Sequence, residues 1–260
     1  MLKAIFLDLD NTLIWDKKSV DEALKTACEL AAEKSDADPG QLEQAIRERA
    51  PELFTSFDTY NLGDRIGISP LEGLWADADN EHPGVQLTKM LPEYRRKTWT
   101  TALQQAEVDD PHLAGEIAET FKQERETRQF VYEETFEVLN KLREHYQLLL
   151  LTNGLTGLQQ KKLSITPALK AYFDQIVISG SYGKGKPDPA IFEHACGLTS
   201  VHQNEALMVG DNPYTDIAGA ARAGIPSVWL NHHAEDVQDV RPTYEVSRLS
   251  ELLEVVAKLK

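Results

Sequence analysis

The chain has 260 residues, enough for one large domain or for a core with a smaller module. Its 27 lysines and arginines are outnumbered by 42 aspartates and glutamates, which gives a formal net charge of -15. This charge repels polyphosphate backbones and anionic lipid surfaces, so neither nucleic acid nor a membrane is an expected partner. No leader sequence or long apolar stretch is evident, so we expect a cytoplasmic protein in which Cys28 and Cys196 are free thiols.

Short apolar runs that end in polar residues recur along the chain and predict buried parallel strands. They are residues 4–7, 148–151, 176–178, 206–209 and 227–230. Helical spacing of apolar residues lies between them, for example at 136–142 and at 217–223, where Gly224 closes the pattern. This alternation is typical of a doubly wound α/β fold with a parallel, Rossmann-like sheet.

The alternation of strand and helix stops between residues 16 and 130, where only helical spacing is found. The sequence therefore predicts two domains. Residues 1–15 and 131–260 form the α/β core, and residues 16–130 form an all-helical cap inserted after the first strand.

Local signals within this cap predict where its helices begin. The capping-box pair Ser19 and Glu22 predicts the start of the first helix. Pro92 and Pro111 are predicted to lie in the first turns of later helices. Residues 63–83 are rich in glycine, proline and aspartate and are predicted to be loops.

Polar residues follow the predicted strands directly, and in an open parallel sheet the carboxyl ends of the strands line one crevice. The residues expected to converge there are Asp8, Asp10, Thr152, Asn153 and Asp211. Three carboxylates repel one another unless a cation neutralises them, and ligands made only of oxygen favour Mg²⁺ over zinc or copper. The hydroxyl and the amide can donate to phosphate, and a lysine can supply positive charge. The sequence therefore predicts a site for magnesium and a phosphate group.

Four motifs carry a family resemblance: Asp8-Leu9-Asp10-Asn11-Thr12-Leu13, Thr152-Asn153-Gly154, Lys186-Pro187-Asp188-Pro189, and Gly210-Asp211-Asn212 followed by Asp216. In order and spacing they resemble the four motifs of haloacid dehalogenase-like hydrolases. The resemblance covers the whole chain, because a large subclass carries a helical cap between the first two motifs. Taken whole, the chain is also similar to a Bacillus-type subgroup to which phosphoserine phosphatase activity is assigned.

The resemblance implies a role for each acidic residue of the motifs. Asp8 is expected to attack phosphorus and form a phospho-aspartate, while Asp10 protonates the leaving oxygen and then activates water. Asp8 and Asp211 are expected to bind magnesium through carboxylates, and Asp10 through its backbone carbonyl. Asp216 is expected to support this metal site, although it could simply cap the helix that follows. Dehalogenating relatives lack an aspartate two positions after the nucleophile, so Asp10 favours phosphoryl chemistry.

The resemblance also implies that Thr152, Asn153 and Lys186 hold the transferring phosphoryl group. Lys184 lies close in sequence to Lys186 and competes for the lysine role. The proline that follows Lys186 favours Lys186, and Lys184 is then expected to be a solvated loop residue.

Several other residues have side chains that could bind a ligand, but most of them are expected to be ordinary surface or core residues. His232 and His233 are predicted to be surface loop residues, because adjacent side chains on a strand point to opposite faces. A solvated helix face is predicted for Arg95, Arg96 and Lys97, and the cap core for Trp75, Trp99 and Tyr94. The candidates for contacting substrate from the cap are Arg65, Glu72, Asp77 and His82.

The leading functional hypothesis is hydrolysis of a small phosphomonoester, with phosphoserine as the preferred substrate. Alternatives are a pyrimidine or purine nucleoside monophosphate, a sugar phosphate, or phosphoryl transfer between two sugar positions by a mutase. A catalytically silent module that senses a metabolite is a hypothesis of a different class, and the intact motifs argue against it.

Overall fold

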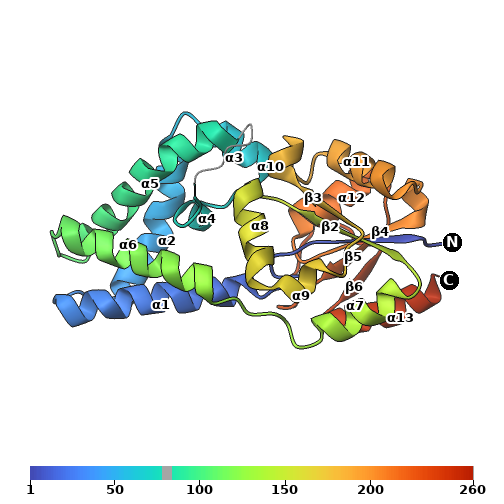
Figure 1. The fold of residues 1–260 in the computed structure, drawn as a ribbon, viewed down its shortest axis with the longest axis horizontal. Helices are drawn as coiled ribbons and strands as arrows, with labels where there is room; N and C mark the ends of the chain where they lie inside the picture. Colours follow the sequence, from blue (N-terminus) through green and yellow to red (C-terminus); the bar gives the residue numbers. More distant parts are fainter. Residues whose placement is uncertain (78–83, 260) are drawn as a thin grey trace. The chain divides into compact units, whose positions relative to one another are not determined.

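The computed structural model describes residues 1–77 and 84–259, which form two compact units (Figure 1). The first unit contains Met1–Trp15, Phe130–Asn153 and the chain from Thr166 onward. The second contains Asp16–Gln129 and Gly154–Ile165. None of the described helices combines the length and apolar character needed to cross a membrane.

The first unit is built on a six-stranded parallel sheet with the strand order β3-β2-β1-β4-β5-β6. The strands are β1 (Ala4–Leu7), β2 (Gln147–Thr152), β3 (Gln175–Ile178), β4 (Ala206–Gly210), β5 (Ser227–Leu230) and β6 (Tyr244–Val246). The predicted parallel α/β fold is confirmed. Strand β6 was not predicted, because Glu245 is exposed, Tyr244 is partly buried and only Val246 is buried, so the segment has no apolar run.

Helices cover both faces of this sheet (Figure 1). The helices of this unit are α7 (Thr135–Arg143), α9 (Pro167–Lys170), α10 (Ser179–Tyr182), α11 (Pro189–Thr199), α12 (Ala218–Ala223) and α13 (Leu252–Lys258), together with η1 (Gln203–Glu205), η2 (Pro213–Ile217) and η3 (Leu249–Glu251). On one face, Ile191 and Phe192 of α11 and Ala220 of α12 pack against the apolar side chains of β1, β2 and β4. Helices α7 and α13 lie together on the other face.

The three central strands, β2, β1 and β4, end side by side. In the register of the sheet, Leu7 of β1 lies between Leu150 of β2 and Val209 of β4. The chain leaves these strands at Asp8, after Thr152, and at Asp211, so the predicted polar residues emerge at one edge of the sheet.

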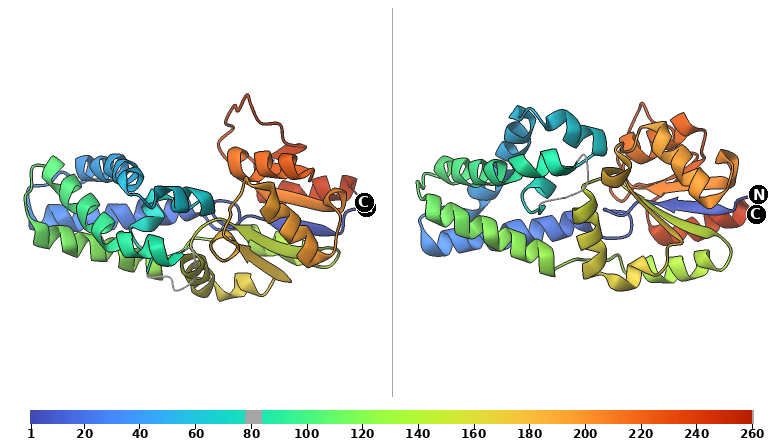
Figure 2. Two further views of the ribbon diagram at one scale, coloured as in Figure 1. Left: turned by 90° about the horizontal axis from the view of Figure 1, so that it is seen from above. Right: turned by 45° about the horizontal axis from the view of Figure 1, so that its top comes forward.

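In the described part of the second unit, all the regular secondary structure is helical (Figure 2). They are α1 (Asp16–Lys34), α2 (Pro39–Ser56), α3 (Tyr60–Ile66), α4 (Pro70–Gly73), α5 (Gly84–Gln105), α6 (Pro111–Thr127) and α8 (Thr156–Ile165). Helix α1 lies beside α6, and α2 lies beside α5. Apolar side chains of these helices form one core, which includes Tyr94 and Trp99 of α5 and also Trp75, just after α4. Asp110 caps α6 and Pro111 lies in its first turn, as predicted.

Several local predictions in this unit were wrong. Helix α1 begins at Asp16, so Ser19 is buried inside the helix and is not its cap. Pro92 lies inside α5, because an apolar stripe through Leu87, Leu91 and Tyr94 continues across it.

The segment predicted as loop, residues 63–83, contains the end of α3 and all of α4. Here Pro70 occupies the first turn of α4, and Ser69 and Glu72 form its capping box. The glycines and prolines that suggested loops therefore mark the ends of short helices. His82 lies outside the described residues.

Helix α8 follows the Thr152-Asn153-Gly154 motif, and the sequence analysis assigned it to the core, but it packs in the second unit. Leu155 and Leu158 join the apolar core of the second unit. The Nζ of Lys162 lies 2.8 Å from Glu72 Oε1, and Gln159 Nε2 donates to the same oxygen at 3.1 Å. Contacts with residues distant in sequence place α8 in the second unit, and the local sequence pattern does not contain that information.

Lys162 belongs to a buried charge network of the second unit. Its Nζ also lies 3.6 Å from Asp16 Oδ1, and Arg125 pairs with the same carboxylate. Burial opposes ionisation of Asp16, but the positive charges of Lys162 and Arg125 outweigh burial and lower its pKa. The lysine side chain is only 2% exposed, so its charge is compensated by protein groups and not by water.

We therefore expect Lys162→Met to lower the free energy of unfolding by about 3–5 kcal/mol, because the buried carboxylate of Glu72 would keep its hydrogen bonds but lose its counter-charge. Lys161→Met is the matched control: Lys161 pairs with Asp77 and Glu126 at a partly exposed position, so its loss should cost under about 1 kcal/mol. Urea denaturation followed by tryptophan fluorescence measures both values. An equal decrease in the free energy of unfolding for both variants would show that the buried Lys162–Glu72 pair contributes no more to stability than the partly exposed pairs of Lys161.

Candidate active site

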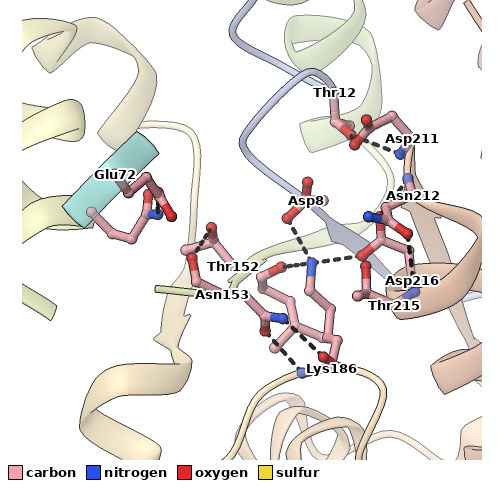
Figure 3. Close-up of polar contacts among 12 residues, drawn as sticks. Asp8, Thr12, Glu72, Thr152, Asn153, Lys186, Asp211, Asn212, Thr215 and Asp216 are labelled. Carbon is pink, nitrogen blue, oxygen red and sulfur yellow. Dashed lines mark hydrogen bonds and ion pairs between the residues drawn. The ribbon is translucent and has the colours of Figure 1, made fainter. Parts of the chain in front are cut away.

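Lys186 is the centre of the polar cluster at the carboxyl edge of the sheet (Figure 3). Its Nζ lies 2.6 Å from Asp8 Oδ1 and 2.7 Å from Asp216 Oδ1, and it donates to the carbonyl of Leu151 at 2.7 Å. Burial opposes the charge of this lysine, but the attraction of Asp216 and Asp8 outweighs burial and raises its pKa. A fixed ammonium group therefore lies against the carboxylate expected to be the nucleophile.

Asn153 holds the backbone of Lys186 through both atoms of its amide. The Nδ2 of Asn153 donates to the carbonyl of Lys186, and the N–H of Lys186 donates to Asn153 Oδ1, each at 2.8 Å. Asn153 therefore positions the lysine, a role that the sequence analysis did not foresee. Thr152, the last residue of β2, is buried next to it. Lys184 pairs with Asp188 at 2.9 Å and remains 42% exposed, away from this cluster.

Asp211 is held from two sides. The hydroxyl of Thr12 donates to Asp211 Oδ1 at 3.3 Å and accepts from the Asp211 N–H at 3.1 Å (Figure 3). The indole N–H of Trp229, on β5, donates to the Asp211 carbonyl at 2.8 Å. Neither partner was predicted, although the place of Thr12 within the first motif was a signal that could have revealed it.

Asp216 does not cap the helix that follows it. Asn212 is the cap: its Oδ1 accepts from the N–H groups of Tyr214 at 2.9 Å and Thr215 at 3.2 Å. The carboxylate of Asp216 instead points inward, with Oδ2 accepting from the Asn212 N–H at 3.1 Å. A Cβ at Gly210 would lie 2.1 Å from this oxygen, so the close approach of Asp216 requires glycine there.

Asp8, Asp211 and Asp216 form a cluster of carboxylates. One oxygen from each lies within 4.8 Å of the others. Burial and the negative charges of Asp8 and Asp216 raise the pKa of Asp211 well above its usual value. Burial, together with repulsion from Asp8, raises the pKa of Asp216 to about 6 despite its pairing with Lys186.

This cluster fits a hard divalent cation. One lysine cannot neutralise three carboxylates, and a cation among them would remove the repulsion that raises the pKa of Asp211. The donors are oxygens, which Mg²⁺ prefers.

The first motif forms a tight loop after β1. The carbonyl of Leu9 accepts from the N–H groups of Leu13 at 3.0 Å and Ile14 at 3.1 Å. Asp10 lies in this loop, two residues after Asp8, and is partly exposed. The loop therefore carries both aspartates of the motif on a short, hydrogen-bonded segment.

The prediction of a surface position is wrong for His232. Its ring is partly buried, its Nε2–H donates to the Asn11 carbonyl at 2.9 Å, and it stacks on Tyr132. His233 is exposed, as predicted. Burial lowers the pKa of His232.

The candidates for binding substrate from the cap differ in how available their charges are. Arg65 is exposed. Glu72 is engaged by Lys162, and Asp77 is engaged by Lys122 and Lys161. These two carboxylates are therefore already neutralised within the second unit. Buried core positions are occupied by Trp75, Trp99 and Tyr94, as predicted.

Comparison with known proteins gives consistent matches over most of the chain. A family model described as haloacid dehalogenase-like hydrolase matches residues 2–224. Phosphoserine phosphatase from Thermus thermophilus is 35% identical over 232 residues, covering 88% of this chain and 89% of the relative. N-acylneuraminate-9-phosphatase from Rattus norvegicus is 35% identical over 256 residues, covering 96% and 92%.

Solved structures share the fold. The magnesium-bound HAD-hydrolase YfnB from Bacillus subtilis has a TM-score of 0.70 at 18% identity and covers 98% of both chains. A 2-haloacid dehalogenase from Pseudomonas syringae has a TM-score of 0.62 at 26% identity and covers both chains completely. Similarity to YfnB at this identity shows the fold alone.

Proposed function

Because this chain belongs to the haloacid dehalogenase-like hydrolase family, we propose that it is a phosphatase that hydrolyses small phosphomonoesters through a phospho-aspartate on Asp8. The observation that carries this proposal is the position of Lys186, whose Nζ bridges Asp8 and Asp216 within a cluster of carboxylates. An ammonium group there can stabilise both the attacking carboxylate and the charge on the transferring group.

The reaction is proposed to proceed in two displacements. An oxygen of Asp8 forms a bond to phosphorus while the bond to the leaving oxygen breaks, and Asp10 donates a proton to that oxygen. Asp10 then removes a proton from water as the water oxygen attacks phosphorus, which releases phosphate and restores Asp8. Thr152 and Lys186 are proposed to hold the phosphoryl oxygens, with Asn153 positioning the lysine.

Magnesium is the proposed cofactor. The residues that would hold it are Asp8 and Asp211 through carboxylates and Asp10 through its backbone carbonyl, with Asp216 supporting the site through Lys186 and the Asn212 N–H. When bound, Mg²⁺ would neutralise negative charge on the carboxylates and on the phosphoryl oxygens. Turnover of an aryl phosphate that requires added Mg²⁺ and stops with a chelator is the expected result; turnover unaffected by the chelator would refute the metal assignment.

The role of Asp10 predicts a dependence on the leaving group. We expect Asp10→Asn to lower kcat for an alkyl phosphate by about 100-fold to 10,000-fold, because general acid catalysis contributes roughly that much. The rate of the first step, formation of the phospho-enzyme, should fall much less for an aryl phosphate, because its leaving group needs less protonation. Burst kinetics with both substrates separate the two steps. An equal loss in the first step for both would show that Asp10 does not protonate the leaving group.

Phosphoserine is the proposed preferred substrate. Similarity to phosphoserine phosphatase over 88% of this chain supports the proposal. N-acylneuraminate 9-phosphate is the second candidate, because the match to N-acylneuraminate-9-phosphatase covers 96% of the chain at the same identity. Matches to pyrimidine 5'-nucleotidases cover less than half of the chain, which gives nucleotides weaker support.

We expect phosphoserine to have the highest kcat/KM in a panel that also contains N-acylneuraminate 9-phosphate, nucleoside monophosphates and hexose phosphates. Specificity is a ratio of these values, so all substrates are compared under one set of conditions. If another substrate exceeds phosphoserine by about tenfold, which corresponds to about 1.4 kcal/mol in transition-state binding, the serine assignment is wrong. The phosphatase proposal would survive that result.

A further inference from the structure

We propose that His232 is a positioning residue for the metal site, acting through the backbone of Asn11 and the hydroxyl of Thr12. The proposal rests on the proposed function, which assigns Asp10 and Asp211 to magnesium. His232 lies just after β5 and is 221 residues away from Asn11 in sequence, yet its Nε2 lies 2.9 Å from the Asn11 carbonyl oxygen. A carbonyl oxygen only accepts, so Nε2 must carry the hydrogen and donate it.

Asn11 has a backbone conformation that needs support. Its φ is 57°, in the left-handed region that costs free energy for any residue with a side chain. The peptide groups on both sides of Asn11 form hydrogen bonds. The Asn11 N–H donates to the Ile14 carbonyl at 2.7 Å, and the Asn11 carbonyl accepts from His232.

The peptide group that His232 holds is the one between Asn11 and Thr12. Its orientation sets the position of Thr12, whose hydroxyl contacts both Oδ1 and the N–H of Asp211. On the other side, Asn11 is joined directly to Asp10. The hydrogen bond from His232 therefore helps to hold the backbone that joins Asp10 to Thr12, the partner of Asp211.

The imidazole is itself fixed in place. Its ring stacks on Tyr132 with centroids 4.7 Å apart and planes 19° from parallel, and Tyr132 stacks on Trp15 at 5.6 Å. The Tyr132 N–H donates to the Leu13 carbonyl at 3.4 Å, so the aromatic stack is attached to the same loop that His232 contacts. A ring held in this way can act as a rigid donor.

The test compares two substitutions that separate the ring from its hydrogen bond. His232→Phe keeps a ring to stack on Tyr132 but has no donor. His232→Gln keeps an N–H at a similar reach but has no ring. His233→Phe is the matched control, because His233 is the adjacent exposed histidine. The measurements are the Kd of Mg²⁺ by calorimetry, the thermal midpoint, and kcat and KM for an aryl phosphate.

We expect His232→Phe to weaken Mg²⁺ binding by roughly fivefold to tenfold, the effect of one typical hydrogen bond, and to lower kcat with KM nearly unchanged. His232→Gln should recover most of the Mg²⁺ affinity, and His233→Phe should match the wild type. An unchanged Mg²⁺ Kd in His232→Phe would overturn the proposal. So would equal weakening in the Phe and Gln variants, because that result would trace the effect to ring packing. A wild-type protein that binds Mg²⁺ but has no phosphatase activity would refute the proposed function while leaving this comparison of affinities valid.

Discussion

Asp8→Asn should abolish turnover of every phosphomonoester, with kcat lower by roughly 10,000-fold or more. Asparagine has nearly the same size and shape as aspartate, but its amide is a poor nucleophile and cannot form the acyl phosphate. Its Oδ1 can still accept from Lys186, whose Nζ lies 2.6 Å from the carboxylate in the wild-type protein. The variant should therefore fold normally and lose only the chemistry.

Asp239→Asn is the matched control for this experiment, because it makes the same change at an exposed position. Steady-state kinetics measure the loss, and circular dichroism with thermal denaturation checks the fold of each variant. An Asp8→Asn protein that retains more than about one hundredth of wild-type kcat would contradict nucleophilic catalysis by Asp8.

Lys186→Met should lower kcat/KM by about 100-fold to 1,000-fold, the effect of removing a charged group that stabilises a transition state. The substitution keeps the length of the side chain but leaves Asp8 and Asp216 buried without their shared cation. A stability loss of about 3–5 kcal/mol should accompany it, because a broken buried ion pair leaves uncompensated charge. Kinetics are therefore measured well below the thermal midpoint of the variant.

Lys184→Met provides the comparison, since the Lys184 ammonium group is partly exposed and pairs with Asp188. Its kcat/KM should stay within about twofold of wild type, as exposed ion pairs contribute little. A larger loss in Lys184→Met than in Lys186→Met would transfer the role to Lys184.

The parallel sheet could be predicted from the sequence because its strands are short apolar runs. Residues 4–7 and 206–209 are completely buried, so their pattern is uninterrupted. The order of strands then brings residues separated by about two hundred positions to one edge of the sheet. For this reason Asp8 and Asp211 could be expected near one another from the strand pattern alone, whereas Lys186 was expected there only because of the family resemblance.

Contacts that depend on the path of distant loops could not be predicted. Nothing local to His232 indicates that its ring reaches Asn11, and a histidine after a strand is usually a surface residue. The charge of Glu72 also looked available for substrate until its partner Lys162 was found on α8. Both errors have the same physical origin, since tertiary packing decides which polar groups are paired.

Capture of the phospho-enzyme tests directly whether Asp8 is the nucleophile. The reaction with an aryl phosphate and Mg²⁺ is quenched in acid within one turnover, reduced with borohydride and digested for mass spectrometry. Borohydride converts an acyl phosphate of aspartate to homoserine, so we expect homoserine at position 8, and only when substrate is present. Unmodified Asp8 in a reaction quenched during active turnover, or modification at another residue, would contradict it.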